Sequence, residues 1–336
     1  MINVGIDKYE GLKERLRKFN EKKKKKRVTD ARLNFTQYTA HVIPLSTQRF
    51  ILSPFNRSVL FSQIGCGTFN KLFSINNTTP LNILRGSYER FGLLKLWKGT
   101  TPHLASGTIF PGIYILSRWV SDLKYIPYND KRRVVYVKRY LSLFSVYTFS
   151  HLFSYPFDVA YTRLATNYSG SVKIKSHLRS VWNTKGMQGF YSGFSLCLMS
   201  TATYLLITFP LNEKFQYKLI ESVNDEISKH PLLKQNVKSI QPKELKPVEL
   251  FPFNLIFGSV SAFIARTITY PLDTIRVLYQ YDSWKNNSKS IYSVLMKCTS
   301  GGWLRLYSGF SMKCVLLVPE CLLYGTFYSI VIKSLS

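Results

Sequence analysis

The sequence is poor in acidic residues and has no metal-binding motif. It contains 18 Asp and Glu against 46 Lys and Arg, which gives a formal net charge of +28 over 336 residues. This imbalance favours anionic partners, namely nucleic acid, an anionic membrane surface or anionic solutes. The five cysteines have neither CxxC nor metal-ligand spacing, so the sequence predicts no zinc site and no disulfide framework.

The first residues lack the apolar core of a secretory signal. A mitochondrial presequence is an alternative, but Asp7, Glu10 and Glu14 argue against it. The basic run EKKKKKR at Glu21–Arg27 is either a solvated tail or a segment with a specific role. We predict a basic N-terminal extension over residues 1–34.

Arrangements that indicate an enzyme or a nucleic-acid binder are also missing. The sequence shows no nucleophile–base pattern and no phosphate-cradling loop, so we predict that the protein is not an enzyme. The basic residues are spread over connecting segments instead of gathering on one recognition element, so we predict no nucleic-acid partner.

Apolar segments of membrane length are present. Four have close to the about 20 residues that a helix needs to cross a bilayer: Thr101–Val120, Phe194–Leu211, Phe251–Tyr270 and Met312–Ile332. Two weaker candidates end in Gln48–Phe55 and Leu141–Phe157, which makes six. The alternative, a soluble helical protein with a large core, fits poorly with the absence of charge from Phe194–Leu211.

Two motifs each occur three times, in strict alternation. SPFNRSVLFSQ, YPFDVAYTRLA and YPLDTIRVLYQ align on Pro54, Pro156 and Pro271, at intervals of 102 and 115 residues. GLLKLWKG, GMQGFYSG and GWLRLYSG follow them and end at Gly99, Gly193 and Gly309. Such a period indicates an internal repeat, and a proline inside each first helix predicts a kink there.

A repeat of about 100 residues, with two membrane helices each and a P-x-[DE]-x-x-[KR] motif closing the first of them, resembles the mitochondrial carrier family. The best match to the family pattern is PLDTIRVLYQ. The resemblance implies an all-α membrane protein of six transmembrane helices in a threefold pseudosymmetric bundle, with short matrix helices. It also implies a multi-pass location in the mitochondrial inner membrane. The expected divisions are residues 35–125, 135–221 and 251–336 for three carrier repeats, with an extended loop on the intermembrane-space side over 222–250.

The resemblance implies a matrix gate, in which the acid of each odd helix pairs with the base of the next. The acid positions are Asn56, Asp158 and Asp273, and the base positions are Val59, Tyr161 and Arg276. We therefore expect an ion pair between Asp158 and Arg276, a neutral pair between Asn56 and Tyr161, and no partner from Val59 for Asp273. Gln63 and Gln280 keep the positions of the glutamines that brace such pairs.

The cavity of such a bundle also has expected residues. Arg49, His151 and Arg266 each precede a repeat proline by five residues and form a possible anion site. Ser106, Ser200 and Leu316 occupy the family's substrate-contact positions. Glu320 is an additional charge within a predicted span and a further site candidate.

The glycines Gly99, Gly193 and Gly309 have two readings. Glycine admits a tight turn, and the helix start after it offers free N–H groups to an anion. In carriers such helix starts hold cardiolipin phosphates, so the resemblance implies bound cardiolipin and no other cofactor.

Two functions remain open. Only one of the three gate ion pairs survives in sequence, and the gate motifs of the even helices are also incomplete, which favours an accessory subunit of a larger inner-membrane complex. The alternative is an active carrier that exchanges a small anionic metabolite, which the basic residues Arg49, His151 and Arg266 favour.

Overall fold

A computed structural model describes residues 35–64, 79–120, 133–167, 174–229, 251–285, 290–300 and 302–335. In these residues the regular structure is helical and no strand occurs, which confirms the all-α prediction. A first helix spans residues 35–51. The remaining elements are α2 (Ser53–Ile64), α4 (Pro80–Phe91), η1 (Leu93–Trp97), α5 (Thr100–Val120), α6 (Arg133–Thr166), α7 (Ile174–Phe190), α8 (Phe194–Lys229), α10 (Phe251–Lys285), α11 (Ile291–Thr299), η3 (Trp303–Tyr307) and α12 (Phe310–Leu335).

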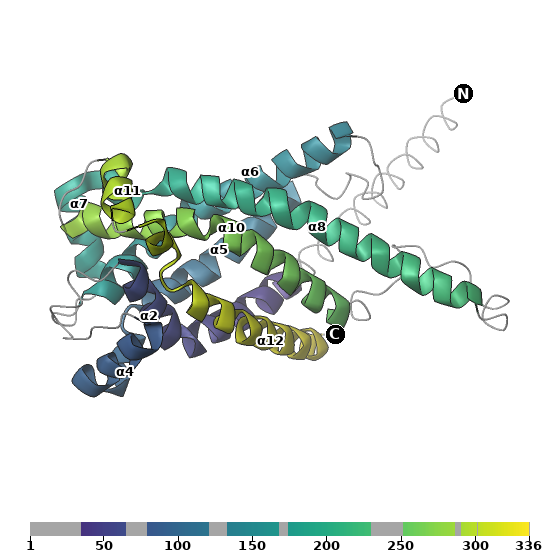
Figure 1. Cartoon of the computed structure of the whole chain (residues 1–336), viewed down its shortest axis with the longest axis horizontal. Helices are drawn as coiled ribbons and strands as arrows, with labels where there is room; N and C mark the ends of the chain where they lie inside the picture. The colour runs from purple at the N-terminus through teal and green to yellow at the C-terminus, as the bar shows by residue number, and fades with distance from the viewer. Residues whose placement is uncertain are drawn as a thin grey trace, which may run out of the picture.

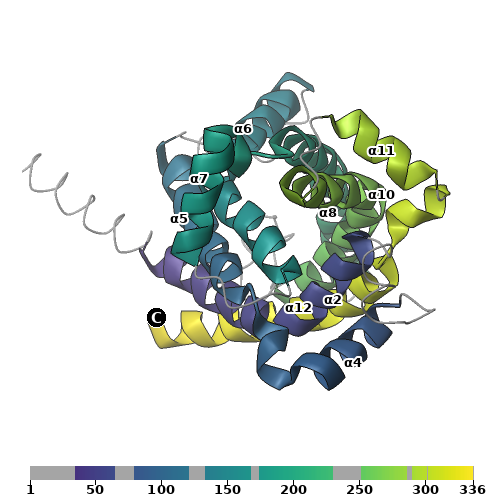
Figure 2. The ribbon, with the colours of Figure 1, turned by 90° about the vertical axis from the view of Figure 1, so that its left-hand side faces the viewer.

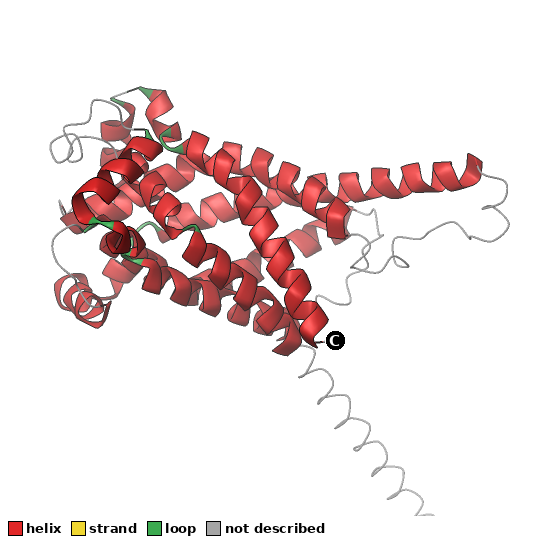
Figure 3. Ribbon diagram, turned by 90° about the horizontal axis from the view of Figure 1, so that it is seen from below, coloured by secondary structure: helices red, strands yellow, loops and turns green. Residues whose placement is uncertain are grey.

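The long helices run roughly side by side and form a ring when seen from one end (Figures 1 and 2). The shorter helices α4, α7 and α11 gather at one end of this ring, at the left of Figure 1. The view coloured by secondary structure shows the same bundle from below, with one helix projecting well beyond the others (Figure 3). This helix is α8, which continues to Lys229, so the predicted loop 222–250 begins within a helix. Residues 230–250 and the N-terminal extension 1–34 lie outside the described residues.

The prolines of the first motif occupy helices in two different ways. Pro156 lies inside α6 and Pro271 inside α10, and both helices continue past them. At the first repeat the helix is interrupted at Leu52, and Pro54 stands in the first turn of α2. Pro54 has no N–H for the Phe50 carbonyl, and this carbonyl accepts a hydrogen bond of 2.9 Å from Trp97 Nε1 instead.

The second motif forms the same turn each time. Gly92, Gly186 and Gly302 at its beginning, and Gly99, Gly193 and Gly309 at its end, all have positive φ. The last three stand directly before α5, α8 and α12. A residue with a side chain rarely adopts this backbone conformation, so the turn explains why glycine stands at these places.

Polar side chains point inward and apolar ones outward along the long helices. Buried polar side chains on α6, α8 and α10 include Ser150, Ser154, Thr162, Ser200, Ser261, Thr269, Thr274 and Gln280. Exposed apolar side chains on α6, α8, α10 and α12 include Phe149, Phe153, Met199, Leu206, Ile264, Ile268, Val315 and Leu322. A water-soluble bundle has the opposite arrangement, whereas lipid accepts apolar side chains on the outside of a bundle.

Length and composition identify two candidate membrane spans in the described residues, Phe194–Asn212 and Trp303–Ser334. The other predicted spans fall short because Ser, Thr, Tyr and Pro interrupt their apolar residues. The helical architecture is therefore established, and the count of six membrane helices stays a prediction.

Candidate functional site

The centre of the ring contains a cavity of about 440 Å³. Its lining residues come from the helix of residues 35–51 and from α2, α5, α6, α10 and α12. The charged residues and histidines among them are Arg49, His103, His151, Asp158, Arg266, Asp273, Arg276, Lys313 and Glu320. A cavity with this many ionisable groups is suited to a charged solute and not to an apolar one.

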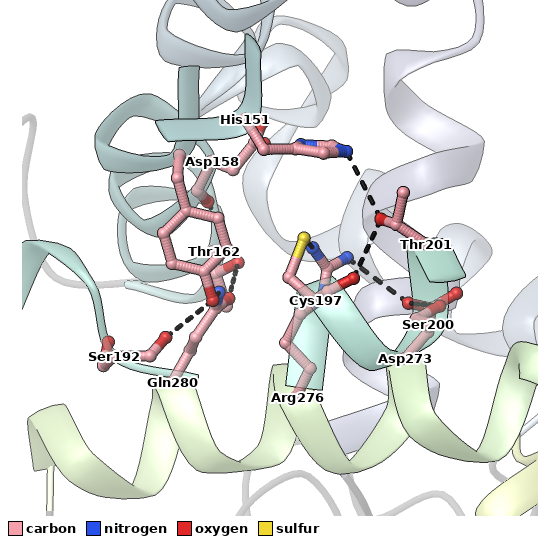
Figure 4. Close-up of polar contacts among 11 residues, drawn as sticks. His151, Asp158, Thr162, Ser192, Cys197, Ser200, Thr201, Asp273, Arg276 and Gln280 are labelled. Atoms are coloured by element: carbon pink, nitrogen blue, oxygen red, sulfur yellow. Dashed lines mark hydrogen bonds and ion pairs between the residues drawn. The ribbon is translucent and has the colours of Figure 1, made fainter. Parts of the chain in front are cut away.

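The expected ion pair between Asp158 and Arg276 is not formed. Arg276 instead lies 3.8 Å from Asp273, three residues earlier on the same helix. Side chains with this spacing share one helix face, so the guanidinium reaches its own helix's acid. Its Nη1 also contacts Cys197 Sγ at 3.6 Å, and Asp273 accepts a hydrogen bond of 3.0 Å from Ser200 on α8 (Figure 4). This polar cluster joins α10 to α8, not to α6.

The expected neutral pair between Asn56 and Tyr161 is also replaced by other contacts. Asn56 Oδ1 accepts a hydrogen bond of 2.6 Å from Lys313 on α12. Tyr161 stacks on the ring of His103, with 4.4 Å between the ring centroids. Val59 packs in an apolar cluster with Leu52, Met312 and Leu316. Lys313 therefore supplies the cation next to Asn56, while Val59, at the first base position, is an apolar core residue.

The two predicted brace glutamines bind tyrosines. Gln280 Nε2 donates to Tyr155 Oη at 3.0 Å and Gln280 Oε1 accepts from Thr162 at 2.8 Å, which ties α10 to α6. Gln63 on α2 makes a side-chain hydrogen bond with Tyr270 on α10. Tyr155 and Tyr270 each precede a repeat proline, and their hydroxyls donate to the carbonyls of Ser192 and Ser308 at 2.8 Å. Through these tyrosines, each glutamine links its own proline helix to the glycine turn of the preceding repeat around the ring.

The three residues of the possible anion site all line the cavity, in different surroundings. Arg49 Nη1 donates to the carbonyl of His103 and to Ser106 Oγ, both at 2.6 Å. Arg266 forms an ion pair of 3.1 Å with Glu320. His151 Nε2 lies 3.5 Å from the Thr201 hydroxyl. Of the two arginines, Arg266 is neutralised by an acid, whereas Arg49 makes no ion pair within the described part of the chain.

Sequence reasoning missed Lys313 and His103. Lys313 Nζ lies 3.3 Å from Glu320 Oε1, so Glu320 is shared between Lys313 and Arg266. Both overlooked residues lie within segments that were predicted as membrane spans. A charged or ionisable residue in such a segment is itself a signal of a functional site, and this signal would have identified them.

Several buried polar atoms of the cavity lining have no hydrogen-bond partner. They are His103 Nδ1, His151 Nδ1, Tyr161 Oη and Arg276 Nε. Buried polar atoms in folded proteins are normally hydrogen-bonded. These atoms are covered by the side chains around them, so the polar lining is not fully satisfied by its own hydrogen bonds.

Comparison with known proteins identifies the family. The family model for the mitochondrial carrier protein matches residues 135–223 and 249–336, which is more than half of the chain. The chain belongs to the mitochondrial carrier family. Membership confirms the resemblance seen in the sequence and indicates a transporter of the mitochondrial inner membrane, not an enzyme.

Several similar proteins are named as carriers of one solute. The mitochondrial thiamine pyrophosphate carrier 1 of Candida glabrata is 27% identical over 266 residues, which cover 71% of this chain and 78% of that protein. The protein of the same name from Saccharomyces cerevisiae S288c is 27% identical over 226 residues, covering 62% of this chain and 61% of that protein. The mitochondrial carrier protein CoAc2 of Zea mays is 25% identical and covers 52% of this chain.

These relatives correct the predicted accessory role. The loss of gate ion pairs favoured an eroded carrier within a larger complex, but the similar proteins are named as solute carriers. The structure also shows why missing gate residues are a poor guide. Lys313 stands beside Asn56, and Ser200 and Arg276 contact Asp273, so polar contacts remain where the sequence suggested loss. The larger complex was predicted on the same grounds and stays only a prediction.

Proposed function

We propose that this protein is an active carrier that exchanges a small anionic metabolite across the mitochondrial inner membrane. The observation that carries this proposal is Arg49. Its guanidinium faces the central cavity and, among the described residues, makes hydrogen bonds only to neutral groups. A cation held this way attracts a negatively charged solute, because a buried charge is stable only with a partner.

The charge of the whole lining supports the same proposal. Arg49, Arg266, Arg276 and Lys313 outnumber Asp158, Asp273 and Glu320, which leaves one positive charge in excess among these lining side chains. A volume of about 440 Å³ is also within the range of sites for small solutes.

The relatives suggest the first solute to test. Proteins named thiamine pyrophosphate carriers share about a quarter of their aligned residues with this chain, and pyrophosphate is an anion that Arg49 would attract. Thiamine pyrophosphate is therefore our leading candidate substrate, ahead of inorganic phosphate and carboxylates.

We propose six membrane helices in three repeats for the complete bundle, with residues 35–125, 135–221 and 251–336 as the repeats. The inward polar and outward apolar side chains support a position in lipid. The two matched segments of the family model support the second and third repeats.

A matrix gate remains our interpretation of the proline region. The helices α2, α6 and α10 contact one another there, and the positions Asn56, Val59, Asp158, Tyr161, Asp273 and Arg276 lie on them. We propose that these contacts open and close during transport, with Lys313 of α12 acting beside Asn56.

Bound cardiolipin is a further part of the proposal. The starts of α5, α8 and α12 follow Gly99, Gly193 and Gly309, and such helix starts offer N–H groups to a phosphate. Native mass spectrometry of the purified protein should detect retained cardiolipin. Retention of other phospholipids in equal amounts would contradict this assignment.

Uptake by proteoliposomes tests the transport function. Purified protein, reconstituted and loaded with unlabelled thiamine pyrophosphate, should take up labelled thiamine pyrophosphate with saturation. Arg49→Gln should reduce this uptake at least tenfold, because a hydrogen bond to a charged group contributes about 1.5–3 kcal/mol. Arg85→Gln is the matched control, since Arg85 is exposed on α4 and, in the described part of the chain, forms its ion pair with Glu89. Absence of exchange for thiamine pyrophosphate, nucleotides, phosphate and carboxylates alike would reject the carrier proposal.

A further inference from the structure

Most charges in the cavity are neutralised by a neighbour. Arg266 and Lys313 share Glu320, at 3.1 and 3.3 Å. Arg276 lies 3.8 Å from Asp273. These pairs account for three cations and two acids of the lining.

Two opposite charges remain, Arg49 and Asp158. Both line the cavity, and neither makes an ion pair in the described part of the chain. They come from different elements, the helix of residues 35–51 and α6.

The position of Arg49 is fixed by packing. Its guanidinium is held by the His103 carbonyl and Ser106 on α5. Its side chain also lies against Gly107, where an added Cβ would come within 3.0 Å of the arginine Cδ. Glycine at position 107 leaves the room that Arg49 occupies, and these contacts hold the arginine beside α5.

Two stacked rings, those of Tyr161 and His103, connect the surroundings of Asp158 to those of Arg49. Tyr161, one turn after Asp158 on α6, stacks on His103, whose carbonyl accepts from Arg49. The Tyr161 hydroxyl and His103 Nδ1 are buried without a partner. The cavity thus has a cation, a pair of stacked rings and an anion in its lining.

We infer that the cavity binds a solute of mixed charge, with an anionic phosphate or pyrophosphate on Arg49 and a cationic ring or ammonium group on Asp158. This inference rests on the proposed carrier function and narrows its substrate class. A purely anionic solute would satisfy Arg49 but would face the carboxylate of Asp158, which makes no ion pair in the described part of the chain and repels an anion. A solute with both charges satisfies both residues.

A matched pair of solutes tests the inference. Thiamine pyrophosphate carries a cationic thiazolium ring, and 3-deazathiamine pyrophosphate has a neutral thiophene ring of nearly the same shape. In reconstituted vesicles the wild-type protein should take up the cationic solute at least about tenfold faster at equal low concentration, which is the effect of one charged contact. Asp158→Asn should lower this ratio of the two rates to near one.

An acid outside the cavity is the control. Glu89→Gln removes a carboxylate on the exposed face of α4, where it pairs with Arg85. It should leave the ratio of the two rates unchanged. Thermal unfolding of each variant checks that it is folded.

The outcomes separate the inference from the carrier function. Uptake of both solutes at equal rates by the wild type would overturn the inference while leaving the protein a carrier. An Asp158→Asn variant that loses both rates equally would also overturn it, because Asp158 would then act in gating and not in selecting charge. Absence of any uptake would reject the carrier function itself.

Discussion

Glu320 on α12 and Arg266 on α10 form an ion pair of 3.1 Å at the wall of the central cavity. The other carboxylate oxygen of Glu320 lies 3.3 Å from Lys313 Nζ. Lys313 in turn donates a hydrogen bond to Asn56 on α2. One carboxylate therefore links three helices, and its removal affects all of them.

Glu320→Gln is expected to destabilise the protein by about 1–3 kcal/mol, because Arg266 and Lys313 lose the charge that both of them face. A thermal melt of the purified protein in detergent measures this loss. Glu89→Gln removes the carboxylate of an exposed pair with Arg85 on α4 and should change the melting temperature little. Equal melting temperatures for both variants and the wild type would show that the Glu320 network does not stabilise the bundle.

Tyr155→Phe should also destabilise the protein, by about 1–3 kcal/mol. The lost hydroxyl leaves Gln280 Nε2 and the Ser192 carbonyl without their partner in a fully buried region. Tyr191→Phe is the control on the neighbouring ring, since its hydroxyl bonds one exposed carbonyl, that of Leu152. Urea or thermal unfolding of both variants compares them, and a larger effect of Tyr191→Phe would contradict the role given to Gln280.

Gly99→Ala should be more damaging than Gly92→Ala, although both glycines have positive φ. Alanine in this conformation costs about 1–2 kcal/mol at either position. At Gly99 the new Cβ would in addition lie 2.9 Å from the backbone nitrogen of Ala165, whereas at Gly92 nothing lies within 4 Å. The yield of folded protein and its melting temperature are the readouts. Equal losses would mean that α5 and α6 can move apart to admit a methyl group.

We predict from the surroundings of His177 that the free energy of unfolding falls in mild acid. It lies on α7, outside the predicted membrane spans, with its ring edge-on to Trp284 and its Nε2 buried without a partner. Burial, followed by the nearby Arg163, lowers its pKa from the ordinary 6.5 to about 4. The unfolded chain binds a proton at higher pH than the folded one, so the stability contribution of this residue is complete above pH 6.5 and is lost as pH falls towards 4.

His177→Gln should remove this part of the pH dependence. Melting temperatures between pH 7 and pH 4.5 should fall less steeply for the variant than for the wild type. Identical slopes would show that His177 stays accessible to protons in the folded protein.

The sequence was sufficient to place the glycine turns and the helical class. Proline fixes its own φ, and glycine alone readily adopts positive φ, so the glycines before α5, α8 and α12 could be placed at turns without a structure. The class of fold followed from the same signals.

The partners of the charged residues could not be predicted in this way. Whether Arg276 faces Asp158 or Asp273 depends on how each helix is rotated, which packing between distant segments decides. Lys313 and Asn56 are 257 residues apart in the chain, and no local pattern indicates that they meet. The family pattern supplied expected pairs, and the charges of this chain pair differently.

The helix α8 is longer than a bilayer is thick. At 1.5 Å per residue, its 36 residues measure about 54 Å, against a hydrocarbon layer of about 30 Å. Tilting cannot hide such an excess, and the last turns contain Glu221, Asp225, Glu226 and Lys229, which require water. With Phe194–Asn212 as the proposed span, we expect about 20 Å of this helix to extend beyond the bilayer. Distance measurements between a lipid label and a label on the last turns of α8 test this reach.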